Sequence, residues 1–172
     1  QVDLVSEHID LAVRIGNLDD STDLVARLIG VQHVVIVGTP GYIAKRGAPR
    51  SQADLSVHAC IVGRRQGNRI AWLLKQPEGS ITRHAVSVKH EIQDFETVQR
   101  AVRAGHGLAQ LPLWLVQDDI RDGRLLTVLD GMSGGEVPIN VLWPRTKALP
   151  AKIRVVVDGL VRGLRELSTA IA

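Results

Sequence analysis

Six histidines and one cysteine are the residues of this chain best suited to bind a metal ion or to act as nucleophiles. The histidines are spread along the sequence, at His8, His33, His58, His84, His90 and His106. Two of them, His84 and His90, fall in one predicted strand region, but no cysteine or carboxylate pair lies near enough in sequence to complete a ligand set. Cys60 lies in the apolar run HACIV, as a buried structural thiol does. We therefore expect no metal site.

Carboxylates are the other candidates for chemistry, and Asp94 and Glu96 are the pair closest to a predicted functional element. They stand at the start of a predicted helix, where a carboxylate is stabilised by the amides and the positive end of the dipole. Acid–base catalysis would need two carboxyl groups that face each other in apolar surroundings. The patterns HExxH, GxxxxGK(S/T) and CxxC do not occur. The sequence therefore favours a protein that is not an enzyme and needs no cofactor.

Residues 91–112 form the most clearly patterned segment of the chain. Its apolar side chains recur at helical spacing, at Phe95, Val98, Ala101 and Val102. Asp94 is the predicted N-cap, and Gly105 or Gly107 supplies the left-handed residue that ends the helix. A short buried strand follows, and Pro112 suits the first position of the next helix. The segment therefore predicts a helix, a glycine corner, a buried strand and a second helix.

The other segments alternate between helical and strand patterns, which predicts an α/β fold. The predicted elements are a helix at 2–8, a strand at 9–15, two strands at 24–28 and 34–37 separated by Gly30, a helix at 40–46, a strand at 58–63, an antiparallel pair at 71–75 and 81–88, a helix at 113–121, strands at 125–129 and 139–143, and a last helix from Pro150. In that last helix we expect Ile153, Val156, Val157 and Leu160 to face the core.

Length and composition indicate an ordinary globular chain. Its 172 residues are 45% hydrophobic, which is enough to bury a core. No apolar run is long enough to span a membrane, and the first residues, QVDLVSEHID, lack the pattern of a signal peptide. The net charge of +3 comes from Lys and Arg residues that are dispersed along the sequence, so we do not expect this chain itself to bind nucleic acid. A single cysteine fits a reducing cytoplasm.

Five segments, in order, resemble the effector-binding domain of LysR-type transcriptional regulators. They are VDLVSEHIDLAVRIGNL, GTPGYIAKRGAP, the helix–GxG–strand–LP unit of residues 91–112, DGRLLTVL and LWPRTKALPAKIRVVVDGL. The resemblance implies two Rossmann-like lobes of the periplasmic-binding-protein type, with a small-molecule cleft between them. It assigns 1–37 and 139–172 to an incomplete first lobe and 38–138 to the second. It also implies that the first strand and helix of that lobe, and a winged helix-turn-helix, precede Gln1.

The resemblance further implies which residues bind the effector. The family's positions correspond here to Arg14, Gly16, Asn17, Gly38, Thr39, Ile92, Gln93, Asp94, Phe95, Leu111 and Pro112. Three of them also have simpler explanations: Arg14 pairs with a neighbouring acid, Asn17 turns the chain, or Thr39 caps a helix. Because Asp94 and Glu96 already occupy the positive end of their helix, a carboxylate effector needs another partner, for which Arg14 is the candidate, or the effector is neutral.

Two functions fit this resemblance. In the first, the chain is the ligand-sensing domain of a cytoplasmic transcriptional regulator that forms a homodimer or homotetramer and contacts DNA only through the upstream helix-turn-helix. In the second, it is an extracytoplasmic solute-binding protein of a transporter. Neither involves a membrane-spanning segment in this chain. The sequence does not name the effector.

Overall fold

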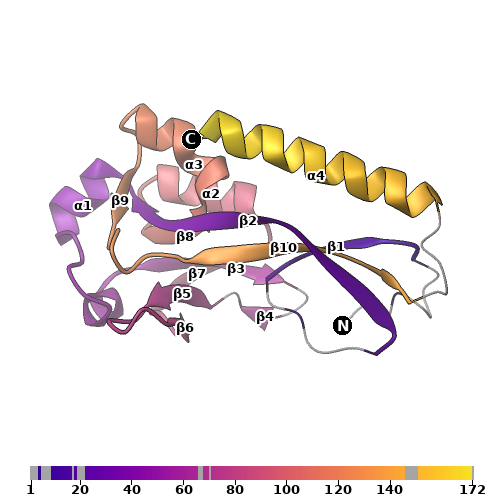
Figure 1. The fold of residues 1–172 in the computed structure, drawn as a ribbon. Coiled ribbons are helices and arrows are strands. Elements are labelled where there is room, and N and C mark those ends of the chain that lie inside the picture. The colour runs from indigo at the N-terminus through magenta and orange to yellow at the C-terminus, as the bar shows by residue number, and fades with distance from the viewer. Residues whose placement is uncertain are drawn as a thin grey trace. The chain divides into compact units, whose positions relative to one another are not determined.

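The fold is seen in a computed structural model that describes residues 4, 9–16, 18, 22–65, 68–69, 71–145 and 151–171, without the side chains of 64–65, 68–69 and 165–171. The chain forms two compact units (Figure 1). Unit 1 comprises Gln1–Gln32 and Val137–Ala172, and unit 2 comprises His33–Glu136. The helix predicted at 2–8 and the start of the last helix at Pro150 lie outside the described residues.

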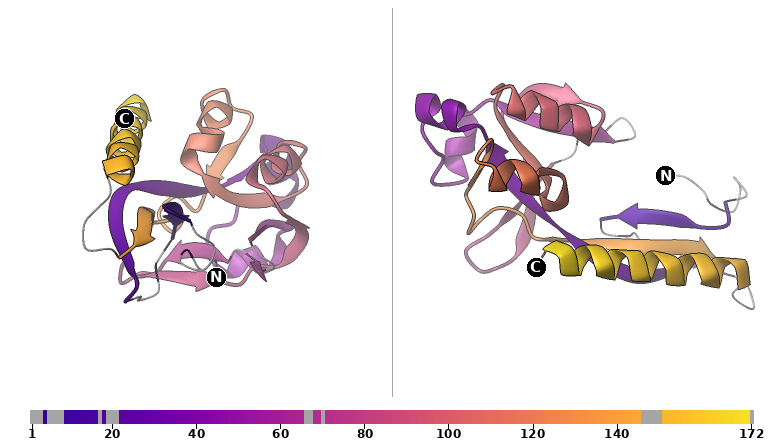
Figure 2. Two further views of the ribbon diagram at one scale, coloured as in Figure 1. Left: turned by 90° about the vertical axis from the view of Figure 1, so that its right-hand side faces the viewer. Right: turned by 90° about the horizontal axis from the view of Figure 1, so that it is seen from above.

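The described part of unit 1 contains three strands and one long helix. Strand β1 (Ala12–Ile15) pairs antiparallel with β10 (Glu136–Pro144), which lies next to β2 (Leu24–Gly38). Helix α4 (Ala151–Ile171) runs along β10, as Figure 2 shows. The core of the unit joins β10 to α4 through Ile139, Val141, Trp143, Ile153 and Val157. Among the described residues, no helix is long and apolar enough to cross a membrane.

The prediction of two short strands separated by Gly30 is wrong, because the structure has one continuous strand, β2, in their place. The strand is continuous from Leu24 to Gly38, and Gly30 lies inside it. A Cβ built at Gly30 would lie 3.5 Å from Leu164 Cδ1 of α4, which is an ordinary van der Waals distance. Gly30 therefore lies inside the strand beneath α4 and does not mark a break in the strand.

Helix α4 also differs from its predicted packing at one residue. Ile153 and Val157 are buried as expected, but Val156 is 50% exposed. One buried stripe suffices because the helix packs on a single sheet face, and Val156 lies beside that stripe. Asp158, which the sequence places four residues before Arg162, lies 3.7 Å from Arg27 of β2.

Unit 2 contains the main sheet of the molecule. Spatially, β9 (Leu126–Val128) pairs with β2, β2 with β8 (Leu108–Pro112), β8 with β3 (Cys60–Arg65), and β3 with β7 (Val88–Ile92). Strands β7 and β8 both run parallel to β3. Two small pieces complete the strands: β4 (Asn68–Arg69) forms a hairpin with β3, and β5 (Trp72–Lys75) pairs with β6 (Ile81–His84).

Alternate residues of these strands supply two cores on opposite faces of the sheet, because successive side chains of a strand point to opposite sides. One face packs against α1 (Pro40–Arg46), the 3-10 helix at Ala53–Val57 and β5. The other packs against α2 (Phe95–Arg103) and α3 (Leu113–Arg121), which cover that face in Figure 1. Neighbouring residues divide accordingly: Ile36 belongs to the first core and Val37 to the second.

The predicted strand at 81–88 is wrong in one respect. Strand β6 ends at His84, and β7 begins at Val88 and joins the main sheet. Pro112 is also placed differently, since it ends β8 and is the N-cap of α3, with φ −57° and ψ 134°. Its extended ψ keeps it out of the helix. The predicted helices at 40–46 and 113–121 have the observed bounds of α1 and α3.

Candidate functional site

The carboxyl ends of the parallel strands define one edge of the unit 2 sheet. Gly63 of β3 lies opposite Ile92, the last residue of β7, and Val34 of β2 lies opposite Pro112, the last residue of β8. We call this the carboxyl edge and define it by Val34, Gly63, Ile92 and Pro112. In open α/β sheets, ligands bind outside the carboxyl ends of the strands. This edge is therefore the candidate functional site.

Helices α2 and α3 both begin at the carboxyl edge, because α2 follows β7 after two residues and α3 follows β8 directly. Asp94 caps α2 as predicted: its Oδ1 accepts a hydrogen bond of 2.7 Å from the amide of Thr97. Gln99 Nε2 donates to the carbonyl of Leu115 at 2.8 Å, which ties α2 to the first turn of α3. The predicted residues Ile92 to Phe95 and Pro112 thus belong to the same edge of the sheet, with β3 between β7 and β8.

Phe95 departs from its predicted role in the core. Its side chain is 38% exposed, although the helical pattern places it on the packed face with Val98 and Val102. Phe95 is the first residue of α2, and the residues on both sides of it, Asp94 and Glu96, are exposed as well, so this end of the helix is not covered. An exposed aromatic at a strand's carboxyl end is available to pack against a ligand.

The two helix starts at the carboxyl edge differ in charge. At α2, the hydrogen bond from the Thr97 amide holds the pKa of Asp94 below its usual value, so the group is negative near neutrality, and Glu96 adds a second carboxylate. The first turn of α3 contains no acidic residue, and its N-cap, Pro112, makes no side-chain hydrogen bond. The dipole of α3 is therefore the one not offset by acidic side chains.

Leu111 and Pro112 contribute little side-chain surface to this site. Leu111 is fully buried in the core beneath α2 and α3, and Pro112 is buried as well. Their role in binding is therefore limited to the backbone and to fixing where α3 begins. Gln93, in contrast, is exposed between β7 and α2.

Gly38 and Thr39 are not brought to the carboxyl edge. Strand β2 runs from Val34, opposite Pro112, to Gly38, opposite Leu126 of β9, and these four residues span about 13 Å of strand. At that opposite edge, Thr39 Oγ1 accepts a hydrogen bond of 3.2 Å from the Tyr42 amide and caps α1. The simpler explanation of Thr39 as a helix cap is thus confirmed.

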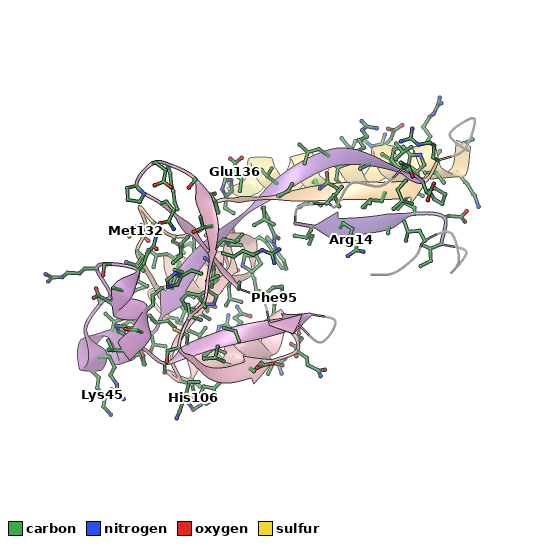
Figure 3. The ribbon with its side chains drawn as sticks, turned by 90° about the horizontal axis from the view of Figure 1, so that it is seen from below. Arg14, Lys45, Phe95, His106, Met132 and Glu136 are labelled. Atoms are coloured by element: carbon green, nitrogen blue, oxygen red, sulfur yellow. The ribbon has the colours of Figure 1, made fainter. Side chains whose placement is uncertain are left out.

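The residues predicted in the first lobe lie in unit 1. Arg14 is in β1, opposite Asn140 of β10, and is labelled in Figure 3. Gly16 follows the strand with φ 110°, and its amide donates to the carbonyl of Pro138 at 2.9 Å. Asn17 lies outside the described residues. The assignment of Arg14, Gly16 and Asn17 to effector binding stays a prediction.

The sequence did not show that Val34 is the residue at which β2 reaches the carboxyl edge. Only the register of β2 against β8 identifies it, because nothing in the local sequence distinguishes Val34 from the rest of the strand. Sequence reasoning also overlooked Asp119, whose side chain is fully buried in α3. Asp119 accepts hydrogen bonds from Arg103 Nε at 2.6 Å, Arg124 Nε at 2.7 Å and Gln99 Nε2 at 2.9 Å.

Ser133 stands in a Gly131–Gly135 run with the spacing GxSxG, which is also the spacing of a hydrolase nucleophile. The structure assigns it a different role. Its Oγ accepts a hydrogen bond of 2.9 Å from the Ile36 amide, and the run lies in a turn between β9 and β10. A nucleophile elbow requires a strand followed by a helix. Ser133 therefore secures the loop to β2.

This arrangement defines a class of protein: an α/β domain of two units with a candidate ligand site at the carboxyl ends of parallel strands. The family model described as "LysR substrate binding domain" matches residues 1–165. The chain belongs to this family, which forms the effector-binding domains of LysR-type transcriptional regulators. The predicted α/β fold and the resemblance to this family are confirmed.

Individual proteins similar to this chain are also transcriptional regulators. The transcriptional regulator CrgA of Neisseria meningitidis is 29% identical over 164 residues, covering 95% of this chain and 54% of CrgA. The transcriptional regulator DmlR of Escherichia coli is 32% identical over 164 residues, covering 92% of this chain and 51% of DmlR. The chain thus spans about half the length of these relatives. Their names favour the regulator over the transport protein and are not those of enzymes.

Solved structures agree with the fold. The regulatory domain of CrgA superposes with a TM-score of 0.73 at 28% identity and covers 93% of this chain and 78% of that domain. The regulatory domain of AphB from Vibrio vulnificus gives a TM-score of 0.75 at 25% identity, covering 94% of this chain and 78% of that domain. Both are regulatory domains of the fold expected from the sequence.

Proposed function

We propose that this chain senses a small-molecule effector and that unit 2 contacts the effector at its carboxyl edge. The observation that carries the proposal is that Ile92–Phe95 and the start of α3 lie at the same edge of the sheet, at the carboxyl ends of β7 and β8. Gln93 supplies an exposed amide, and Phe95 supplies an exposed ring. Together they offer one polar and one apolar contact to a small molecule.

Charge sets the orientation of such a molecule. Asp94 and Glu96 repel an anionic group from the start of α2, whereas no acidic side chain opposes an anion at the first turn of α3. We therefore propose that a carboxylate on the effector points to the start of α3, and that only neutral parts approach α2. A crystal structure with a carboxylate bound to the amides of Phe95 and Glu96 would contradict this orientation.

Thermal unfolding against a panel of small acids, neutral metabolites and amino acids tests the proposal. A ligand at one hundred times its dissociation constant stabilises the chain by about 2.7 kcal/mol. We expect Gln93→Ala and Phe95→Ala to reduce that shift. Arg14→Ala tests separately the prediction that Arg14 of unit 1 binds an acidic effector. Lys45→Ala is the matched control, because Lys45 is exposed on α1 at the opposite edge. A shift that survives the edge variants but disappears in Thr39→Ala would place the site at the opposite edge.

For the whole protein we propose a cytoplasmic transcriptional regulator that is a homodimer or homotetramer. The support is the family and the names of relatives twice as long as the matched segment. Effector binding to this domain would shift the equilibrium between two arrangements of the oligomer, and a separate helix-turn-helix domain would read DNA. Gel-shift titration of the complete protein on its own promoter region, with and without the effector found above, tests this. Equal affinity in both conditions would contradict effector-coupled regulation.

A further inference from the structure

Two histidines that are distant in sequence meet on the surface of unit 2. The ring centroids of His90 and His106 lie 5.7 Å apart, and the ring planes make an angle of 63°. Both side chains are exposed. They come together because β3 pairs with both neighbouring parallel strands: His90 is in β7, and His106 stands in the glycine corner just before β8. Figure 3 labels His106.

The centroid separation suits one metal ion bound by both rings. An imidazole nitrogen binds zinc at about 2.0–2.1 Å, which places the ring centroid about 3.2 Å from the ion. Two rings at a tetrahedral angle then have centroids about 5.2 Å apart, and at opposite positions about 6.4 Å apart. The observed separation lies between these values. Exposed side chains change rotamer readily, so a nitrogen of each ring can turn to a shared ion.

We propose that His90 and His106 form a binding site for a divalent transition-metal ion, namely Zn²⁺, Ni²⁺ or Cu²⁺. These ions favour imidazole nitrogen over other neutral protein ligands. No group of three or more His, Cys, Asp or Glu side chains suited to a metal occurs within the part of the chain that the structure describes. Water therefore completes the coordination, and the site is open and exchangeable, unlike a closed four-ligand zinc site.

A metal ion at this position would close a loop around α2. Strand β7 leads through Gln93 and Asp94 into α2, and His106 follows its C-terminus, where Gly105 has φ 77° and the His106 amide donates to the carbonyl of Ala101. Linking His90 to His106 thus fixes both ends of the β7–α2 segment to each other. The ion binds the folded state, so it raises the stability of unit 2 by an amount that grows with the logarithm of the ion concentration above the dissociation constant. Neither histidine is among the residues proposed to contact the effector.

Isothermal titration with NiCl₂ and ZnCl₂ in a buffer that does not bind metals tests the proposal. The variants are His90→Gln and His106→Gln, alone and together, with His33→Gln and His84→Gln as controls at the other described histidines that are not fully packed. We expect one ion per chain. Loss of an outer-shell partner alone costs 10–100-fold in metal affinity, so losing either ligand should cost at least about 10-fold. The double variant should lose little more than each single variant.

Copper titration followed by electron paramagnetic resonance gives a second measurement. We expect two coordinated nitrogens in the natural sequence and one or none after either substitution, with circular dichroism unchanged because both side chains are exposed. Retained affinity in His90→Gln or His106→Gln would overturn the proposal. So would binding that disappears only in a control variant, or no saturable binding at all.

Discussion

Substitution of Asp119 should destabilise unit 2 more than substitution of any nearby surface acid. Its side chain is fully buried, yet it faces two arginines that are about half exposed. Burial by itself raises the pKa of Asp119, but hydrogen bonds from Arg103, Arg124 and Gln99 outweigh burial and hold the pKa below its ordinary value. The carboxylate is therefore charged in the folded chain and joins α2, α3 and the turn after α3.

The magnitude follows from these contacts. A hydrogen bond to a charged group contributes about 1.5–3 kcal/mol, and breaking a buried ion pair costs about 3–5 kcal/mol when the remaining charge stays buried. Here water can reach Arg103 and Arg124 after the loss of Asp119. We therefore expect Asp119→Ala to lower the free energy of unfolding by about 2–4 kcal/mol, a large part of the roughly 5–15 kcal/mol typical of a domain. Asp119→Asn should be almost as destabilising, because its amide presents donors to the arginines.

Urea unfolding followed by circular dichroism measures this loss. Asp118→Ala is the matched control, because Asp118 is the preceding residue of α3 and pairs with Arg121 at 2.9 Å on the exposed face. Exposed pairs contribute only about 0.2–1 kcal/mol. The reasoning would be refuted by a loss below about 1 kcal/mol for Asp119→Ala, or by an equal loss for the two alanine variants.

Two further predictions concern α4 and His58. Val157 is 1% exposed, and Val157→Ala should lower the free energy of unfolding by about 2 kcal/mol. Val156→Ala should change that free energy by less than about 0.5 kcal/mol, because Val156 is half exposed. Equal losses of the two variants in urea unfolding would contradict the observed buried face of α4. Burial lowers the pKa of His58 below 6.5, partly opposed by Asp54 and assisted by Arg46, and His58 Nδ1 lies 3.3 Å from the Tyr42 hydroxyl. The unfolded chain therefore takes up a proton that the folded chain does not, so stability should fall as pH drops through about 6.5. Unfolding of His58→Gln at several pH values should show a smaller slope, and an unchanged slope would exclude His58 as its source.

Local features of the fold could be predicted from sequence with accuracy. The caps of α1 and α2, Thr39 and Asp94, each accept a hydrogen bond from the amide three residues further on, so their effect is contained in the sequence around them. The glycine corner after α2 is of the same kind, since Gly105 has φ 77°. The family resemblance extended these local predictions to the whole fold, because the matching motifs occur in the same order along the chain as the family's helices and strands.

The sequence did not show which of the predicted site residues share one edge of the sheet. Ile92 to Phe95 and Pro112 lie at the carboxyl edge, whereas Gly38 and Thr39 lie about four strand residues away. The sequence identifies β2 as a strand, but it does not give the register of β2 against β8. That register decides which residues of β2 reach the edge and which reach the opposite one.

The sequence by itself determined what depends on neighbours along the chain: the helix caps, the periodic apolar faces and the glycine turns. Tertiary structure decided what depends on partners far away in sequence. The exposure of Phe95 and Val156, the burial of Asp119 and the contact between His90 and His106 belong to this second group. They share one physical reason. Whether a residue is buried, and what it contacts, depends on which remote element packs over it. A sequence pattern shows that a helix has an apolar face, but not which element covers that face.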